Sequence, residues 1–285
     1  MATAVADNPA LALDAQRRPR AGSALITLAK RRASLTSRTP RQIAVPLLGP
    51  ALLALVAAPA LKVATGGLRT HIDYTAFVGV GTVALVIPLS CVFAGLSVLV
   101  DRHAGAQREL LAAPVPRAYL VLGNLVVALA LATLQVVVLI SLAALRGAHF
   151  DITAAGLGWF AGATLLFTVF MYGVAETLAS RMTKPEDYVG ATPAVAILPF
   201  FFAGALFPIS AMPGALTAIA KVLPLTHALA LMRYGFVDHR ATGLHDIWGM
   251  SNATTEAWLS LAVVALFAVA MTAVAIRAFS RSAVR

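Results

Sequence analysis

Charged side chains are scarce in this sequence, and their scarcity excludes an ordinary soluble protein. Only 12% of the residues are Asp, Glu, Lys or Arg, against about 25% in a typical soluble domain. Hydrophobic residues make up 60%, which is more than a soluble fold can keep away from water. We therefore expect apolar surface to face lipid, and we predict an integral membrane protein.

Several kinds of chemical machinery are also missing. The sequence has no G-x-x-x-x-G-K-[ST] phosphate loop, no H-E-x-x-H motif and no Asp-rich diphosphate motif, so we expect no ATP hydrolysis, catalytic residue, cofactor or metal site in this chain. Its one cysteine, Cys91, leaves no partner for an internal disulfide. The formal net charge of +10 sits in short clusters between long uncharged runs, a pattern of charged membrane loops and not of nucleic-acid binding.

Six apolar runs are long enough to cross a bilayer, which takes about 20 residues of helix. We predict an all-α fold with six transmembrane helices, and the first is expected to bend because it contains three prolines. The predicted spans are residues 43–61, 74–100, 119–145, 156–178, 188–207 and 258–279.

The basic residues predict the orientation of these spans. Segments on the side of the N-terminus hold 16 of the 22 Lys and Arg residues, and the opposite segments hold 6. By the positive-inside rule, both termini are cytoplasmic. We therefore predict a multi-pass protein of the plasma membrane.

The residues before the first span divide into two parts. Residues 1–21 are predicted to be a disordered cytoplasmic tail, and residues 22–42 a basic amphipathic helix. Such a helix lies along the membrane with Lys30, Arg31 and Arg32 near anionic headgroups. A solvated basic tail is the alternative interpretation. The transmembrane domain then covers residues 43–285.

Two further regions stand out. Residues 208–232 consist of short apolar pieces broken by proline, which is typical of a re-entrant segment, here on the outer side. We expect His227 and Arg233, both on the outer segment 208–257, to contact headgroups. Glu176 is the only acid inside a predicted span; it lies near the cytoplasmic edge and is interpreted as interfacial or partner-facing, or alternatively as an intramembrane polar site.

The loop after the second span, residues 101–117, carries both signs of charge and ends at two prolines. We predict a short amphipathic helix over about 101–113, which would dock a soluble partner. Here the sequence resembles the permease subunits of type-2 ABC exporters, such as the daunorubicin-resistance and Nod-factor export permeases. Their loop reads approximately E-R-E-x-G-T-L-E-x-L-L-x-x-P-V-S-R. The matching residues are Asp101 (in place of Glu), Arg102, Gly105, Glu109, Leu110, Leu111, Pro114, Val115 and Arg117.

A second group of similar motifs lies downstream. Residues 198–208 read L-P-F-F-F-A-G-A-L-F-P, and L-P-L-T-H begins at Leu223. The resemblance implies a permease that pairs with a second permease copy or a homologous permease and with two ATP-binding subunits, which carry ATP and Mg. It also implies that the loop is the coupling helix and the N-terminal helix an interface helix, both touching the ATPase. The outer gate would include Gly204, Phe207, Pro208, Pro213 and Pro224.

The resulting functional prediction is a subunit that exports an amphipathic or hydrophobic substrate, such as a drug, lipid or glycolipid, from the cytoplasm or inner leaflet. The nearly uncharged spans favour such a cargo. An ion-coupled secondary transporter is the main alternative, although it usually places several ionisable residues within its spans. An intramembrane enzyme is a further alternative that no motif favours.

Overall fold

The computed structural model describes residues 21–60, 73–106, 110, 112 and 115–282. In these residues the protein is helical and contains no strand, which confirms the all-α prediction. The predicted tail, apart from residue 21, lies outside the described residues.

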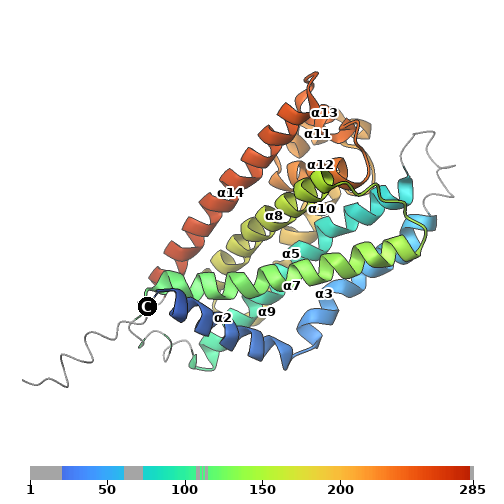
Figure 1. The fold of residues 1–285 in the computed structure, drawn as a ribbon. Coiled ribbons are helices and arrows are strands. Elements are labelled where there is room, and N and C mark those ends of the chain that lie inside the picture. Colours follow the sequence, from blue (N-terminus) through green and yellow to red (C-terminus); the bar gives the residue numbers. More distant parts are fainter. Residues whose placement is uncertain (1–20, 61–72, 107–109, 111, 113–114, 283–285) are drawn as a thin grey trace, which may run out of the picture.

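Five helices are long and apolar enough to cross a membrane, or six if one bent helix pair is counted as a span. They lie side by side as an elongated bundle (Figure 1). They confirm five of the predicted spans. In chain order they are Arg41–Ala60 (α3, Arg41–Leu52, continued by the π-helix η1, Leu53–Ala57), α5 (Tyr74–His103), α7 (Arg117–Leu145), α8 (Ala154–Arg181) and α14 (Ala253–Ser282).

The bundle has two ends with different contents (Figure 1). The end called here the α2 end gathers helix α2 (Ala21–Ser37), the last turns of α5, α8 and α14, and α9 (Pro185–Gly190). The opposite end, called the α13 end, gathers α11 (Gly214–Val222), α12 (Pro224–Phe236) and α13 (Thr242–Trp248).

The predicted span at 188–207 is helical but not one continuous helix. It starts with α9, passes through the π-helix η2 (Pro193–Ile197) and ends with α10 (Leu198–Phe202). Pro193 and Pro199 have no N–H to donate, so regular α-helical hydrogen bonding is interrupted there. The pieces nevertheless connect the α2 end with the α13 end (Figure 1).

Helix α8 forms the centre of the packing, because α5, α7, α12 and α14 all contact it. Glycines allow the closest of these approaches. A Cβ added to Gly156 of α8 would collide with the carbonyl oxygen of Gly235 in α12, and a Cβ on Gly173 would come within 3.0 Å of backbone atoms of Met271 in α14. Small residues at helix contacts are the usual basis of packing in lipid, where apolar burial gives no advantage.

The outer faces of the bundle are apolar. Large exposed side chains include Leu134 and Val137 on α7 and Leu266 and Val269 on α14. In water such surface would be unfavourable, but in a bilayer it faces acyl chains. The exposed residues therefore agree with a multi-pass membrane protein.

Two helix boundaries lie at prolines, and only the first of them differs from the predicted pattern. The expected helix 22–42 ends at Ser37 as α2, and α3 begins at Arg41 after Pro40. At the α13 end, α11 and α12 meet at an angle of 84°, because Pro224 starts a new helix directly after the extended Leu223.

Candidate functional sites at the two ends of the bundle

An ion pair joins α2 to α5 at the α2 end. Nη1 of Arg32 lies 2.8 Å from Oδ2 of Asp101, and Nη2 donates to the carbonyl of Ala94 at 3.3 Å. The side chain of Arg32 is 7% exposed and that of Asp101 28%. The prediction that Arg32 lies near headgroups is therefore wrong: its aliphatic stem is buried and its charge is used inside the protein. Lys30 and Arg31 are exposed.

The next residue along α5 makes a second connection. Arg102 donates to the carbonyls of Ala179 and Met182, which lie at the end of α8. The last carbonyls of a helix have no partner within the helix, so a cation there satisfies them and opposes the helix dipole. Asp101 and Arg102 thus hold α2 and α8 to the same turn of α5.

A buried carboxyl lies nearby in α8. Glu176 is fully buried, and its Oε2 accepts a 2.8 Å hydrogen bond from the hydroxyl of Tyr172 one turn earlier. Its Oε1 has no hydrogen-bond partner among the described residues. The interfacial interpretation of Glu176 is therefore wrong, because the side chain faces the interior of the bundle.

The predicted coupling residues are spread over two helices and the loop between them. Asp101 and Arg102 are the last turn of α5 and not a separate helix, and Gly105 follows with a φ of 79°, which favours glycine. Leu110 is half-buried. Arg117 starts α7 and donates to the carbonyl of Ser280 in α14 at 2.8 Å. Glu109, Leu111 and Pro114 lie outside the described residues.

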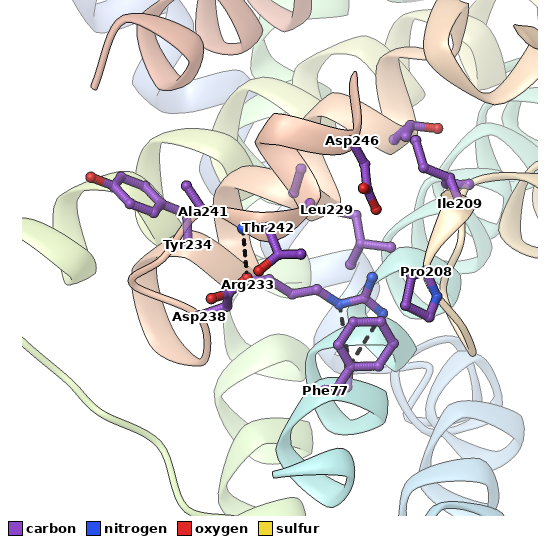
Figure 2. A pocket seen from close by; sticks show the side chains of 14 residues that line it. Phe77, Pro208, Ile209, Leu229, Arg233, Tyr234, Asp238, Ala241, Thr242 and Asp246 are labelled. Carbon is purple, nitrogen blue, oxygen red and sulfur yellow. Dashed lines mark hydrogen bonds between the residues drawn. The ribbon is translucent and has the colours of Figure 1, made fainter. Parts of the chain in front are cut away.

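A buried arginine organises the α13 end (Figure 2). Arg233 of α12, only 8% exposed, donates to the carbonyls of Gly204 at 2.8 Å, Ala205 at 2.7 Å and Phe77 at 3.3 and 3.4 Å. Its guanidinium carbon also lies 3.4 Å from the centre of the Phe77 ring, a cation–π contact. One side chain thus connects α12, α5 and the turn after α10.

The cavity beside Arg233 is small and enclosed by α5, α12 and α13 (Figure 2). Its volume is about 50 Å³, and its wall includes Asp238 and Asp246. Asp238 accepts from the backbone N–H groups of Arg240 and Thr242, and Asp246 accepts from the Ser210 hydroxyl. The Thr226 hydroxyl, which also lines the cavity, has no hydrogen-bond partner among the described residues. A cavity of this volume has room for a few water molecules but not for a drug-sized ligand.

The predicted gate residues surround this end. Gly204 has a φ of 76° and supplies a carbonyl to Arg233, and Phe207 is 43% exposed. Pro208 precedes the 3-10 turn η3 (Ile209–Ala211), Pro213 precedes α11, and Pro224 opens α12. The structure therefore brings the five residues to one end of the bundle.

The prediction that His227 and Arg233 of α12 contact headgroups is wrong. His227 is 3% exposed and bonds the Ser260 hydroxyl at 3.2 Å and the Lys221 carbonyl at 3.0 Å. Like Arg233, it does not contact headgroups. A usable signal was present, because a cation in a short apolar helix must either reach water or find internal partners.

The described residues contain no group of three or more His, Cys, Asp or Glu side chains able to hold a metal ion. The polar groups at both ends instead connect helices. No curated protein matched the sequence. The sequence model of the family described as ABC-2 type transporter matches residues 23–237, which is well over half of the chain and extends from α2 to α12. The chain therefore belongs to the ABC-2 type transporter family.

Proposed function

We propose that this protein is the transmembrane permease subunit of an ATP-driven exporter. Membership of the ABC-2 type transporter family supports a permease role. In this proposal two separate ATP-binding subunits carry ATP and Mg, and a second permease copy or a homologous permease completes the pathway. Both termini and the α2 end face the cytoplasm, as the Lys and Arg distribution predicts.

One observation carries the proposed coupling. The Arg32–Asp101 pair joins the predicted interface helix to the start of the predicted coupling loop, at the same end of the bundle. A partner that docks on α2 and on the loop after α5 would therefore act on connected elements. Arg102 extends the connection to α8. Closure of the ATPase would then move two spans and not one loop.

The proposed gate lies at the other end. Gly204, Phe207, Pro208, Pro213 and Pro224 bound the bent α11–α12 pair, whose short helices are typical of a re-entrant segment. Exit of the cargo would require this segment to move.

The test is ATP-dependent transport by the permease and its ATP-binding subunit in proteoliposomes. Gly105→Val and Glu109→Lys should each reduce the transport rate at least about tenfold, which corresponds to a loss of about 1.4 kcal/mol in the coupling free energy between the ATPase and the permease. Membrane insertion of both variants should remain normal. Gly147→Val, at a turn with a φ of 88° on the other end, and Glu186→Lys, at an exposed helical acid outside the loop, are the matched controls. Normal transport by both loop variants would refute the coupling role.

The nature of the cargo has its own test. An amphipathic compound such as daunorubicin, or a short-chain glycolipid, should stimulate ATP hydrolysis by the complex, because the spans offer mainly apolar surface. Stimulation only by strongly charged hydrophilic solutes would reject this substrate class.

The unpartnered Oε1 of Glu176 favours a second candidate, an ion-coupled transporter. The two candidates are separated by the energy source. ATP should drive transport in the absence of an ion gradient, and Glu176→Gln should retain ATP-driven transport. Transport driven by a proton gradient without ATP, and abolished by Glu176→Gln, would support the second candidate.

A further inference from the structure

A basic cleft opens at the α2 end between the last turns of α5, α8 and α14. Its volume is about 640 Å³, within the range of about 300–1,000 Å³ that is usual for small-molecule sites. Four arginines line it: Arg102, Arg181, Arg277 and Arg281. None of the described residues that line it is acidic. We call it the arginine cleft.

The charges of the arginine cleft are not neutralised by the described part of the chain. Among the described residues, no carboxylate forms an ion pair with Arg181, Arg277 or Arg281. Glu176 interacts electrostatically with Arg102, but it is buried inside the bundle. Like charges that share one cleft repel one another, and an anion between them would offset that repulsion.

Two buried polar atoms of residues in the cleft lining also lack a hydrogen-bond partner within the part of the chain that the structure describes: Nε of Arg102 and Oγ of Ser180. Buried polar groups are normally bonded, and an exception requires an explanation such as an absent ligand or water. The positive-inside rule explains why arginines gather at this end, but it does not explain the cavity that they share. A bound oxyanion would account for the charges and the cavity together.

The surface that leads away from the cleft is apolar. Phe267, Val274 and Arg281 are spaced seven residues apart on α14 and therefore share one face. Phe267 is 36% exposed and packs edge-on against Phe170 of α8, so this face follows the seam between the two helices. The stripe from Arg281 to Phe267 is about 21 Å long at 1.5 Å per residue, comparable to one leaflet of a bilayer.

We propose that the arginine cleft binds the phosphate headgroup of an anionic phospholipid, with an acyl chain along the α8–α14 seam. The guanidinium groups of Arg277 and Arg281 take the phosphate oxygens, since a planar fork matches phosphate geometry. Basic pockets between helices on the cytoplasmic side are suited to such headgroups. The lipid would be an inner-leaflet lipid in the predicted orientation. The site does not depend on the proposed export function.

The test is lipid retention by the purified full chain, measured by native mass spectrometry with phosphatidylglycerol and phosphatidylcholine added in equal amounts. The unaltered protein should retain phosphatidylglycerol preferentially. Arg277→Ala/Arg281→Ala should weaken that retention about tenfold to thirtyfold, from the loss of two headgroup cations. Arg277→Lys/Arg281→Lys should keep a part of it, because the charge remains but the fork is lost.

The matched control is Arg38→Ala/Arg41→Ala, which removes the same charge from exposed residues beside α2 and α3. It should change retention less than about twofold, as expected of charges outside a site. Equal losses in the control and test variants would overturn the proposal, because they would indicate general attraction by net charge. Equal retention of the two lipids would also overturn it.

Inorganic phosphate distinguishes a lipid from a free anion. At millimolar concentration it should displace little phosphatidylglycerol, since it lacks the contacts of the acyl chain with the seam. If phosphate alone protects the protein thermally as well as phosphatidylglycerol does, and that protection disappears in Arg277→Ala/Arg281→Ala, the cleft is a site for a free anion and the lipid assignment is wrong. Lipid retention is measured without ATPase coupling, so its outcome does not depend on whether the proposed export function is correct.

Discussion

Nη1 of Arg32 in α2 lies 2.8 Å from Oδ2 of Asp101 in α5, although 69 residues separate the two along the chain. The pair is asymmetric: the Arg32 side chain is nearly buried, whereas that of Asp101 is more than a quarter exposed. Removing either partner leaves the other charge unpaired. The cost depends on how much water can reach the charge that remains.

We therefore expect Asp101→Ala to destabilise the protein more than Arg32→Ala does. Asp101→Ala strands a buried guanidinium and should cost about 3 kcal/mol, whereas Arg32→Ala leaves a partly hydrated carboxylate and should cost about 1 kcal/mol. Thermal unfolding of the purified variants measures the difference. Arg31→Ala, at an exposed neighbour in α2, should have almost no effect. The opposite order of the two effects would contradict the burial argument.

Arg233 should not tolerate replacement by lysine. A single ammonium cannot donate to Gly204, Ala205 and Phe77 at once, so Arg233→Lys leaves buried carbonyls without partners. We expect a loss of about 2–4 kcal/mol and a lower thermal midpoint. Arg240→Lys, at an exposed residue of the same end, is the control and should be neutral. A neutral Arg233→Lys would mean that these carbonyls are satisfied in another way.

The contact between α8 and α12 should depend on two glycines. Gly156→Ala and Gly235→Ala each place a methyl group against the other residue's carbonyl, so the two helices must move apart. We expect this overpacking to lower the free energy of unfolding by about 1–3 kcal/mol. Gly158→Ala, in the same helix with nothing within 4 Å of its added Cβ, should instead stabilise by about 0.5–1 kcal/mol. Denaturation of the three variants decides the matter. Equal effects at Gly156 and Gly158 would show that backbone entropy and not packing is decisive.

Tyr172→Phe should destabilise the interior of the bundle. The substitution removes the only hydrogen bond that the structure gives to the carboxyl of Glu176, and both oxygens would then be buried without a partner. The expected cost is about 1–3 kcal/mol. Tyr119→Phe, at a half-buried tyrosine of α7, should be close to neutral. The double variant Tyr172→Phe/Glu176→Leu should recover part of the stability, because it removes the stranded group as well.

The long helices were predictable because lipid imposes a simple rule on sequence. The predicted spans 74–100, 119–145 and 156–178 lie within α5, α7 and α8, since each run is apolar and bounded by charge or proline. The predicted span 188–207 differs most, because Pro193 and Pro199 act on backbone hydrogen bonds and leave hydropathy unchanged. Hydropathy alone therefore finds a segment but not its continuity.

The candidate sites were less predictable, because they depend on partners far apart in the chain. Arg32 and Arg31 are neighbours with the same chemistry, yet only Arg32 is buried against Asp101. Arg233 finds its acceptors in the carbonyls of Phe77, Gly204 and Ala205, and backbone carbonyls carry no sequence signal. The arginine cleft likewise forms only when α5, α8 and α14 end at the same level.

Helix α5 carries contacts of both ends: Phe77 meets Arg233, and Asp101 meets Arg32. About 36 Å separates these two positions at 1.5 Å per residue. A hydrogen-bonded helix is hard to stretch, so when one end moves along the helix axis the other end must move by nearly the same distance. Pro88, buried halfway along α5, weakens resistance to bending without shortening the rod. Helix α5 is therefore a connection of nearly fixed length between the two ends of the bundle that can bend at Pro88. Backbone hydrogen bonds set this length, and most side-chain substitutions leave them intact.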